Sequence, residues 1–282
     1  MENSRASSRV KPWLRSLLFW LIAYAGLVLM LVALENKLVY HPYTAAQDWV
    51  PAPYPDIEDV ELTCADGTHI HAWWCPAKDS DQAVLYCHGN AGNLSHRGWS
   101  IAKMREKLGV SVLIIDYPGY GKSGGSPSEQ GCYQAADVGY AWLTEQKKIA
   151  PKNVILYGAS LGGGVITDLA SRKEHRALVL VKTFTSLPDA ANAIYWWLPV
   201  PIRWLMSNRF DSASKIMNCH RPVFIAHGTA DTIVPHAQGE KLYEIANEPK
   251  QFLSMLGSGH NDALPDEFFN SLKQFLRENP VK

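Results

Sequence analysis

The sequence predicts an α/β fold with a mostly parallel central sheet, helices on both faces and one apolar helix ahead of the domain. From residue 83 onward, short apolar runs alternate with longer mixed runs, which is typical of parallel strands joined by crossover helices. Residues 16–34 carry no charge, and a helix of that length can cross a hydrocarbon core about 30 Å thick. A chain of 282 residues accommodates one such domain with an N-terminal appendage.

The expected elements follow the chain in order. Residues 1–15 are expected to form a basic N-terminus, 16–34 a transmembrane helix, 35–57 a connector and 58–282 the α/β domain. Residues 58–75 alternate in polarity around Asp66-Gly67 and predict an antiparallel hairpin. Further strands are expected at 83–87, 110–115, 153–157, 177–181, 222–227 and 250–256, and helices at 96–107, 132–146, 161–172, 236–247 and 265–277.

The residues that flank the run 16–34 indicate its orientation. Basic residues lie almost entirely before it, so the positive-inside rule places the N-terminus in the cytoplasm and the domain outside. A cleavable signal peptide is the competing interpretation, because Ala23-Tyr24-Ala25 resembles a cleavage site, but cleavage there would leave too short an apolar core. We therefore expect a single-pass signal anchor. The flanking residues are Arg5, Arg9, Lys11 and Arg15 before the run, Lys37 after it, and the aromatic residues Trp13, Trp20 and Tyr40 near its ends.

Composition narrows the possible partners. The 27 basic residues balance the 27 acidic ones, and no basic stripe with interleaved aromatic residues points to nucleic acid. The five cysteines are odd in number and lack metal-ligand spacing, so we expect neither a metal nor a disulfide framework. Cys64 would face His69 across a two-residue turn, which leaves Cys75 too far along the ladder to pair with it. We expect the cysteines to be small buried residues.

The segment Gly158-Ala159-Ser160-Leu161-Gly162 joins an expected strand to an expected helix. Glycines on both sides of Ser160 permit a sharp turn that lifts the hydroxyl clear of the backbone. Free N–H groups at the helix N-terminus favour negative charge, such as the oxyanion of a tetrahedral intermediate. The alternative is that Ser160 only caps the helix.

A serine hydroxyl needs a base to remove its proton, and the base needs an orienting acid. Asp231 follows the strand 222–227, and His260 ends the glycine-rich loop after the strand 250–256. With Ser160 they lie past the C-terminal ends of strands, where open α/β sheets place their sites. Asp262 follows His260 too closely to orient it, and Asp211 is expected to cap a helix at Ser212. This chemistry needs no metal or organic cofactor.

The loop His88-Gly89-Asn90-Ala91-Gly92-Asn93 follows the strand 83–87. The backbone N–H groups of Asn90 and Leu161 are the candidate donors to an oxyanion. We expect His88 to shape this loop and His227 to be a structural hydrogen-bonding residue. Asn93-Leu94-Ser95 is a glycosylation sequon that we expect to be unused, because a glycan would crowd the site.

Residues 187–210 break the alternation of strands and helices. The part from Ala193 to Met206 is unusually aromatic, which favours a cap that lines a substrate pocket or contacts lipid. The alternative is a helix packed on the core. The candidate pocket residues are Trp196, Trp197 and Trp204.

Taken together, these motifs resemble the α/β-hydrolase superfamily, and more closely its BEM46-like branch, which includes the α/β-hydrolase domain-containing proteins 12, 13 and 17. The resemblance covers roughly residues 58–278 and implies a serine hydrolase with Ser160, Asp231 and His260 as its triad. Relatives include lipases, lysophospholipases and protein depalmitoylases. Lys182 departs from the acidic or small residue that is more usual there, which bears on pocket specificity. The motifs that carry the resemblance are residues 88–93, residues 116–123 (Asp-Tyr-Pro-Gly-Tyr-Gly-Lys-Ser), residues 158–162, His227-Gly228 with Asp231 and Val234-Pro235, and Gly259-His260.

The sequence thus predicts a membrane-anchored serine hydrolase that cleaves a carboxylic ester or thioester, with an acyl-lipid substrate favoured by the anchor and the aromatic cap. Two alternatives remain open: a serine aminopeptidase-like peptidase, and a catalytically silent hydrolase-fold protein that binds at the membrane. Nothing in the sequence indicates a protein partner.

Overall fold

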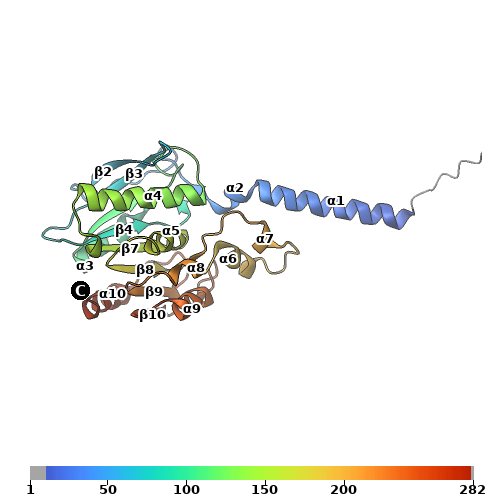
Figure 1. The fold of residues 1–282 in the computed structure, drawn as a ribbon. Coiled ribbons are helices and arrows are strands. Elements are labelled where there is room, and N and C mark those ends of the chain that lie inside the picture. The colour runs from blue at the N-terminus through green and yellow to red at the C-terminus, as the bar shows by residue number, and fades with distance from the viewer. Residues whose placement is uncertain (1–10, 281–282) are drawn as a thin grey trace, which may run out of the picture.

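The computed structural model describes residues 11–280, so that Arg5 and Arg9 of the basic N-terminus lie outside the described residues. An eight-stranded sheet forms the centre of the domain, in the order β10-β9-β8-β7-β4-β6-β3-β2 (Figure 1). β3 runs antiparallel to both of its neighbours, and the remaining pairs are parallel. The strands are β2 (Glu58–Thr63), β3 (His69–Cys75), β4 (Ala83–Cys87), β6 (Ser111–Ile115), β7 (Val154–Ala159), β8 (Ala177–Val181), β9 (Val223–Gly228) and β10 (Lys250–Met255).

Helices cover both faces of the sheet, as Figure 1 shows. Successive side chains of a strand point to opposite faces, so the central strands are apolar throughout and feed two cores. Leu85 and Cys87 of β4 pack with one layer of helices, while Val84 and Tyr86 pack with the other. The first layer holds α4 (Glu129–Ala141), α5 (Leu161–Ala170), α8 (Ser212–Ile216) and α9 (His236–Ile245), and the second holds α3 (Gly98–Leu108) and α10 (Asp266–Glu278).

The sequence-based prediction of the fold is confirmed, with local corrections. The hairpin register is shifted by one residue, because Thr63 pairs with His69 and the turn spans Cys64 to Thr68. The Asp66 carboxylate lengthens this turn by accepting a hydrogen bond from the Thr68 N–H at 2.9 Å. α4 begins earlier than expected, because Ser128 caps it by accepting from the Gly131 N–H at 3.0 Å. A single π-helical turn, Trp142–Gln146, replaces the expected end of the same helix. All five cysteines are free and buried.

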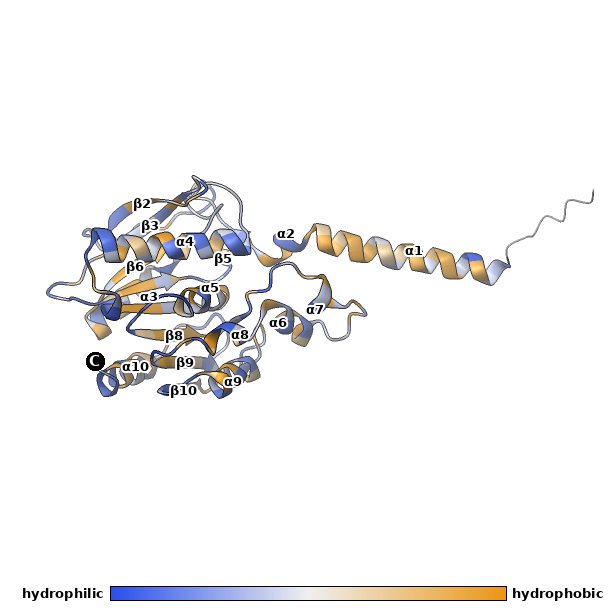
Figure 2. Ribbon diagram, viewed as in Figure 1, coloured by the Kyte–Doolittle hydropathy of each residue, from blue (hydrophilic) through white to orange (hydrophobic). Residues whose placement is uncertain are grey.

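α1 (Pro12–Ala33) projects from the domain as a single apolar helix, as the hydropathy colouring in Figure 2 shows. Its length and composition are sufficient to cross a membrane. After a turn at Leu34 the chain enters α2 (Glu35–Val39) and then β1 (His41–Pro42). β1 pairs in parallel with β5 (Ala91–Gly92), which belongs to the loop after β4. The connector is therefore joined by backbone hydrogen bonds to the loop that carries Asn90.

The segment between β8 and α8 contains the short helices α6 (Leu187–Ile194) and α7 (Ile202–Leu205). We call residues 187–210 the cap. The cap lies next to the C-terminal half of α1 (Figure 1), and the hydroxyl of Tyr24 donates a hydrogen bond to the carbonyl oxygen of Pro199 at 2.7 Å. Two segments 175 residues apart in the sequence thus meet on one side of the domain.

Candidate active site

Ser160 lies at the turn between β7 and α5, with a φ of 52°. A positive φ is strained for a residue with a side chain, so the surrounding structure has to hold it. The Ser160 N–H donates to the Val181 carbonyl at 2.9 Å, and the Ser160 carbonyl accepts from the Thr183 hydroxyl at 2.7 Å. The flanking glycines are needed because a Cβ at Gly158 would collide with the Gly162 backbone, and a Cβ at Gly162 with the Cys87 backbone. The turn therefore packs tightly against β4 and exposes the hydroxyl.

The structure brings Ser160, His260 and Asp231 together. His260 Nε2 lies 3.0 Å from Ser160 Oγ, and His260 Nδ1 lies 2.7 Å from Asp231 Oδ2. An ionised carboxylate can only accept hydrogen bonds, so Nδ1 carries the proton and Nε2 is left to accept from the serine hydroxyl. The three groups come from the C-terminal ends of β7, β9 and β10, which are close in space although far apart in the sequence.

Asp231 is buried, and the environment keeps it ionised. Burial alone would raise its pKa, but hydrogen bonds from His227, His260 and the Val234 N–H outweigh burial and hold the pKa well below its usual range. The second carboxylate oxygen accepts from the Ile233 and Val234 N–H groups at 2.9 and 2.8 Å. Asp231 is thus fixed on the side away from His260 as well.

Asp262 and Lys182 shape the loop that carries His260. The Asp262 carboxylate accepts from the Gly259 N–H at 2.7 Å, and no hydrogen bond to the imidazole is found in the described residues. The Lys182 ammonium donates to the carbonyl oxygens of Gly259 and Asp262 at 2.6 and 2.9 Å. Burial lowers the pKa of Lys182, and the nearby carboxylates of Asp262 and Asp231 oppose that shift. Lys182 is therefore a support for the histidine loop and does not line the cavity described below.

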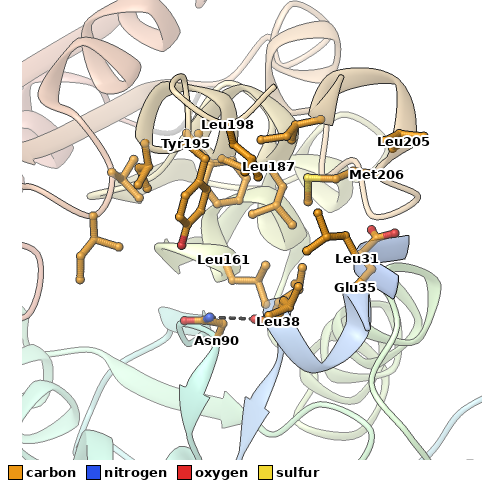
Figure 3. Close-up of a pocket in the computed structure, with 18 of the residues that line it drawn as sticks. Leu31, Glu35, Leu38, Asn90, Leu161, Leu187, Tyr195, Leu198, Leu205 and Met206 are labelled. Atoms are coloured by element: carbon orange, nitrogen blue, oxygen red, sulfur yellow. Dashed lines mark hydrogen bonds between the residues drawn. The ribbon is translucent and has the colours of Figure 1, made fainter. Parts of the chain in front are cut away.

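The loop after β4 places Asn90 beside Ser160. Within residues 11–280, neither the backbone N–H of Asn90 nor that of Leu161 donates to a protein acceptor, and both residues line the cavity that contains Ser160. The Asn90 carbonyl accepts from the His41 N–H at 3.0 Å and from the Tyr120 hydroxyl at 2.8 Å. The Asn90 side chain donates to the Val39 carbonyl at 2.8 Å, the contact drawn as a dashed line in Figure 3. The connector thus fixes the residue that offers this N–H.

Other residues of the same loop are buried and bonded. His88 Nε2 lies 3.2 Å from Asp116 Oδ1, and the His88 carbonyl accepts from the Tyr117 hydroxyl at 2.6 Å. The Asn93 side chain is buried and donates to the carbonyl oxygens of Tyr43 and Asp48, which leaves its amide inaccessible to a glycan. His227 likewise takes part in the fold, since its Nε2 lies 2.9 Å from the Val234 carbonyl oxygen.

An apolar cavity of about 420 Å³ opens above Ser160. Figure 3 shows that it has three walls, which come from the sheet edge, the cap and the junction of α1 with α2. The third wall was missed from the sequence, where residues 35–57 were expected to be only a connector. The wall residues from α1 and α2 are Leu31, Val32, Glu35, Leu38 and Val39, and those from the cap are Leu187, Ala190, Ala191, Ile194, Tyr195, Leu198, Val200, Ile202, Leu205 and Met206.

The three tryptophans of the cap do not line this cavity, which corrects the expectation from the sequence. Trp196, Trp197 and Trp204 are 78%, 64% and 89% exposed and are absent from the cavity wall. α6 ends at Ile194, and the loop beyond it turns other side chains inward, so Tyr195 and Leu198 face the cavity instead (Figure 3). The aromatic character of the segment therefore belongs mainly to its outer surface.

The fold and this arrangement of serine, histidine and aspartate define an α/β-hydrolase. The sequence profile of the alpha/beta hydrolase family matches residues 84–268, and the chain belongs to this family. It is 35% identical over 262 residues to the uncharacterized protein Rv2307c of Mycobacterium tuberculosis, an alignment that covers 91% of this chain and 92% of that protein.

Two further similarities refine this assignment. The chain is 30% identical over 290 residues to the protein bem46 of Schizosaccharomyces pombe, covering 95% of this chain and 97% of bem46, which confirms the predicted BEM46-like branch. The structure of the Pyrococcus furiosus esterase Pf2001 superposes with a TM-score of 0.69 at 22% identity, covering 86% of this chain and 98% of the esterase. That identity shows a shared fold.

Proposed function

We propose that this protein is a membrane-anchored serine hydrolase that cleaves carboxylic esters or thioesters with an apolar acyl group. The observation that carries the proposal is the hydrogen-bond chain from Asp231 through His260 to Ser160. Beside it lie the backbone N–H groups of Asn90 and Leu161, which donate to no acceptor within residues 11–280. A nucleophile, a base, an orienting acid and an oxyanion site are the parts that acyl transfer requires.

The reaction follows from the positions of these groups. Ser160 Oγ attacks the carbonyl carbon while His260 Nε2 takes its proton, and the resulting oxyanion accepts hydrogen bonds from the Asn90 and Leu161 N–H groups. His260 then gives the proton to the leaving alcohol or thiol, which leaves an acyl group on Ser160. Water attacks the acyl-enzyme with His260 as base, and the carboxylic acid leaves as Ser160 is restored.

The cavity supports an acyl substrate. Its lining is almost entirely aliphatic or aromatic, and each methylene that moves from water into such a site contributes roughly 0.8 kcal/mol to binding. Glu35 is the single acidic residue in the wall within residues 11–280. Its oxygens already accept from the backbone N–H groups of Ser207 and Asn208, so no free carboxylate is offered to an α-amino group. These contacts favour an esterase over an aminopeptidase.

The membrane anchor is the second part of the proposal. α1 is long and apolar enough to span a bilayer, and Lys11 and Arg15 lie at its N-terminal end. With this charge bias we place the N-terminus in the cytoplasm and the domain on the outer side. Full-length protein should stay in the membrane after a carbonate wash, and protease added outside intact cells or spheroplasts should digest the domain. A protected domain would refute the orientation, and release by carbonate would refute the anchor.

The catalytic part is tested by labelling with a fluorophosphonate, which reacts with activated serines. Wild type should be labelled and should hydrolyse p-nitrophenyl butyrate, whereas Ser160→Ala should lose the label and about 10⁴-fold or more of the activity. Ser214→Ala is the matched control, because Ser214 is exposed on α8 and should keep both properties. An unlabelled wild type would favour a catalytically silent protein, and a labelled Ser160→Ala would refute the nucleophile.

A further inference from the structure

The tip of the cap lies alongside the helix that we propose to span the membrane. Tyr24 contacts Pro199 and lies about ten residues before the end of α1, which is roughly 15 Å along the helix axis. Since the hydrocarbon core is about 30 Å thick, a cap that reaches this level cannot remain in water while α1 crosses the bilayer. Figure 1 shows the loop before α7 beside α1 and away from the sheet.

The side chains at the tip suit a membrane interface. Residues 190–202 contain no charged side chain, and Arg203 pairs with Asp189 at 2.8 Å. Trp196, Trp197 and Trp204 are mostly exposed, and Tyr195 is 48% exposed. Tryptophan and tyrosine are enriched at membrane–water interfaces, where the ring is apolar and the polar atom stays hydrated. Exposed aromatic side chains that gather in this way favour a surface that is covered in the working protein.

Hydrogen bonds fix the cap relative to the anchor. The buried carboxylate of Glu35 accepts from the Ser207 N–H at 2.9 Å and from the Asn208 N–H at 2.7 Å. The Tyr40 hydroxyl donates to the Asn208 side chain at 2.6 Å. Hydrogen bonds hold the pKa of Glu35 below its ordinary value although burial, the largest single influence, would raise it. The depth of α1 in the bilayer therefore sets the depth of the cap.

The cavity lies between these two elements. Leu31 and Val32 of α1 and Leu205 and Met206 of the cap all line it. We propose that the cap tip, residues 195–204, is a second membrane contact immersed in the leaflet from which α1 emerges, and that the cavity takes the acyl chain of its substrate directly from the bilayer. The membrane contact needs only the proposed anchor, whereas the route of the acyl chain also rests on the proposed function. The partner that covers the cap tip is lipid, because the tip contacts α1, a helix that is itself surrounded by lipid in the proposed membrane-anchored protein.

The membrane contact is tested by fluorescence quenching in phosphatidylcholine vesicles whose acyl chains carry bromine. Full-length wild type is compared with Trp196→Phe/Trp197→Phe/Trp204→Phe, which removes three fluorophores and keeps the apolar surface. The fluorescence intensity lost to bromolipid, in absolute units, should be smaller in this variant than in wild type, because the indoles that it lacks are in contact with lipid in wild type. Trp99→Phe is the matched control, since Trp99 is half-exposed on α3, away from the cap, and its removal should cost only unquenched intensity. Equal quenched intensity in wild type and the triple variant would overturn the membrane contact.

The route of the acyl chain is tested with Trp196→Ala/Trp197→Ala/Trp204→Ala in the same vesicles. Hydrolysis of a long-chain ester dissolved in the vesicles should fall by about tenfold or more, because the tip then loses the apolar surface that keeps lipid against the cavity. Fluorophosphonate labelling and hydrolysis of soluble p-nitrophenyl butyrate should stay close to wild type, because these side chains do not line the cavity. An unchanged ratio of the two activities would overturn this route. A wild type that hydrolyses neither ester would instead refute the proposed function, and the quenching result would still decide the membrane contact.

Discussion

The ammonium group of Lys182 donates a hydrogen bond of 2.6 Å to the carbonyl oxygen of Gly259. Gly259 is the residue that directly precedes the proposed base, His260. Lys182 has a φ of 49° and lies just past the end of β8, so its backbone is held in an uncommon conformation that directs the side chain under the histidine loop. One buried lysine thus ties the end of β8 to the loop after β10.

Lys182→Met should lower kcat by about ten- to a hundredfold with little change in KM, because a loop that moves by about 1 Å misplaces the base without altering the acyl cavity. The measurement is kcat and KM for p-nitrophenyl butyrate in full-length protein. Lys241→Met, an exposed change on α9, is the control and should leave both constants unchanged. A rise in KM at constant kcat would show that Lys182 acts on substrate binding instead.

Asp231→Asn should cost far more activity than Asp262→Asn. An amide at position 231 favours the wrong tautomer of His260, a change that costs about 10⁴-fold in the serine protease triad. Within residues 11–280 the Asp262 carboxylate accepts a hydrogen bond only from the Gly259 N–H, so an amide at this position should cause a modest loss. The measurement is kcat/KM of each variant relative to wild type, and equal losses in the two variants would count against Asp231 as the orienting acid.

The ionised Asp231 carboxylate should also make the free energy of unfolding depend on pH in the acid range. Its pKa in the folded protein lies below the value of about 3.9 for an unfolded chain, so the unfolded state binds a proton more readily. The stabilisation is therefore fully present above about pH 4 and is lost as the pH falls toward the depressed folded pKa. Urea unfolding at pH 6 and pH 3 should show a larger loss of stability in wild type than in Asp231→Asn. The same loss in both proteins would contradict the hydrogen-bond network drawn around this carboxylate.

Acyl-chain preference should depend on residues that face the cavity. Ala191→Phe places a ring in the cavity and should shift the kcat/KM profile of p-nitrophenyl esters toward shorter chains, since each excluded methylene forfeits roughly 0.8 kcal/mol. Ala193→Phe is the matched control on the same helix, because Ala193 is exposed and absent from the wall. Identical profiles for the two variants would mean that the acyl chain binds elsewhere.

The mostly parallel sheet and the positions of the polar residues could be predicted because both follow local rules. Alternating strands and helices specify a parallel sheet, and side chains past the ends of its strands gather at one edge. Ser160, Asp231 and His260 were found from the sequence by that rule together with the glycine-flanked turn at Ser160 and the family resemblance. The distances between them now support the roles proposed for them.

Other features depend on contacts that no local pattern reveals. The wall formed by α1 and α2 depends on Glu35 meeting Asn208 and on Tyr24 meeting Pro199, pairs that are more than 170 residues apart. The outward direction of Trp196 and Trp197 depends on where α6 ends, and the boundaries of elements are the least predictable feature of a sequence. The hairpin register differs by one residue from the expected one, and in its longer turn the Thr68 N–H donates a hydrogen bond to the Asp66 carboxylate.

The central claim, that Ser160 forms an acyl-enzyme, is tested most directly by mass spectrometry of protein quenched in acid during turnover of p-nitrophenyl butyrate. We expect an intact-mass increase equal to one butyryl group, located by peptide mapping on the fragment that contains Ser160 and absent in Ser160→Ala. The acid quench halts deacylation by removing the base that activates water, so the acylated fraction present during turnover is preserved. Turnover without any acylated protein, or a butyryl group on another residue, would contradict the account.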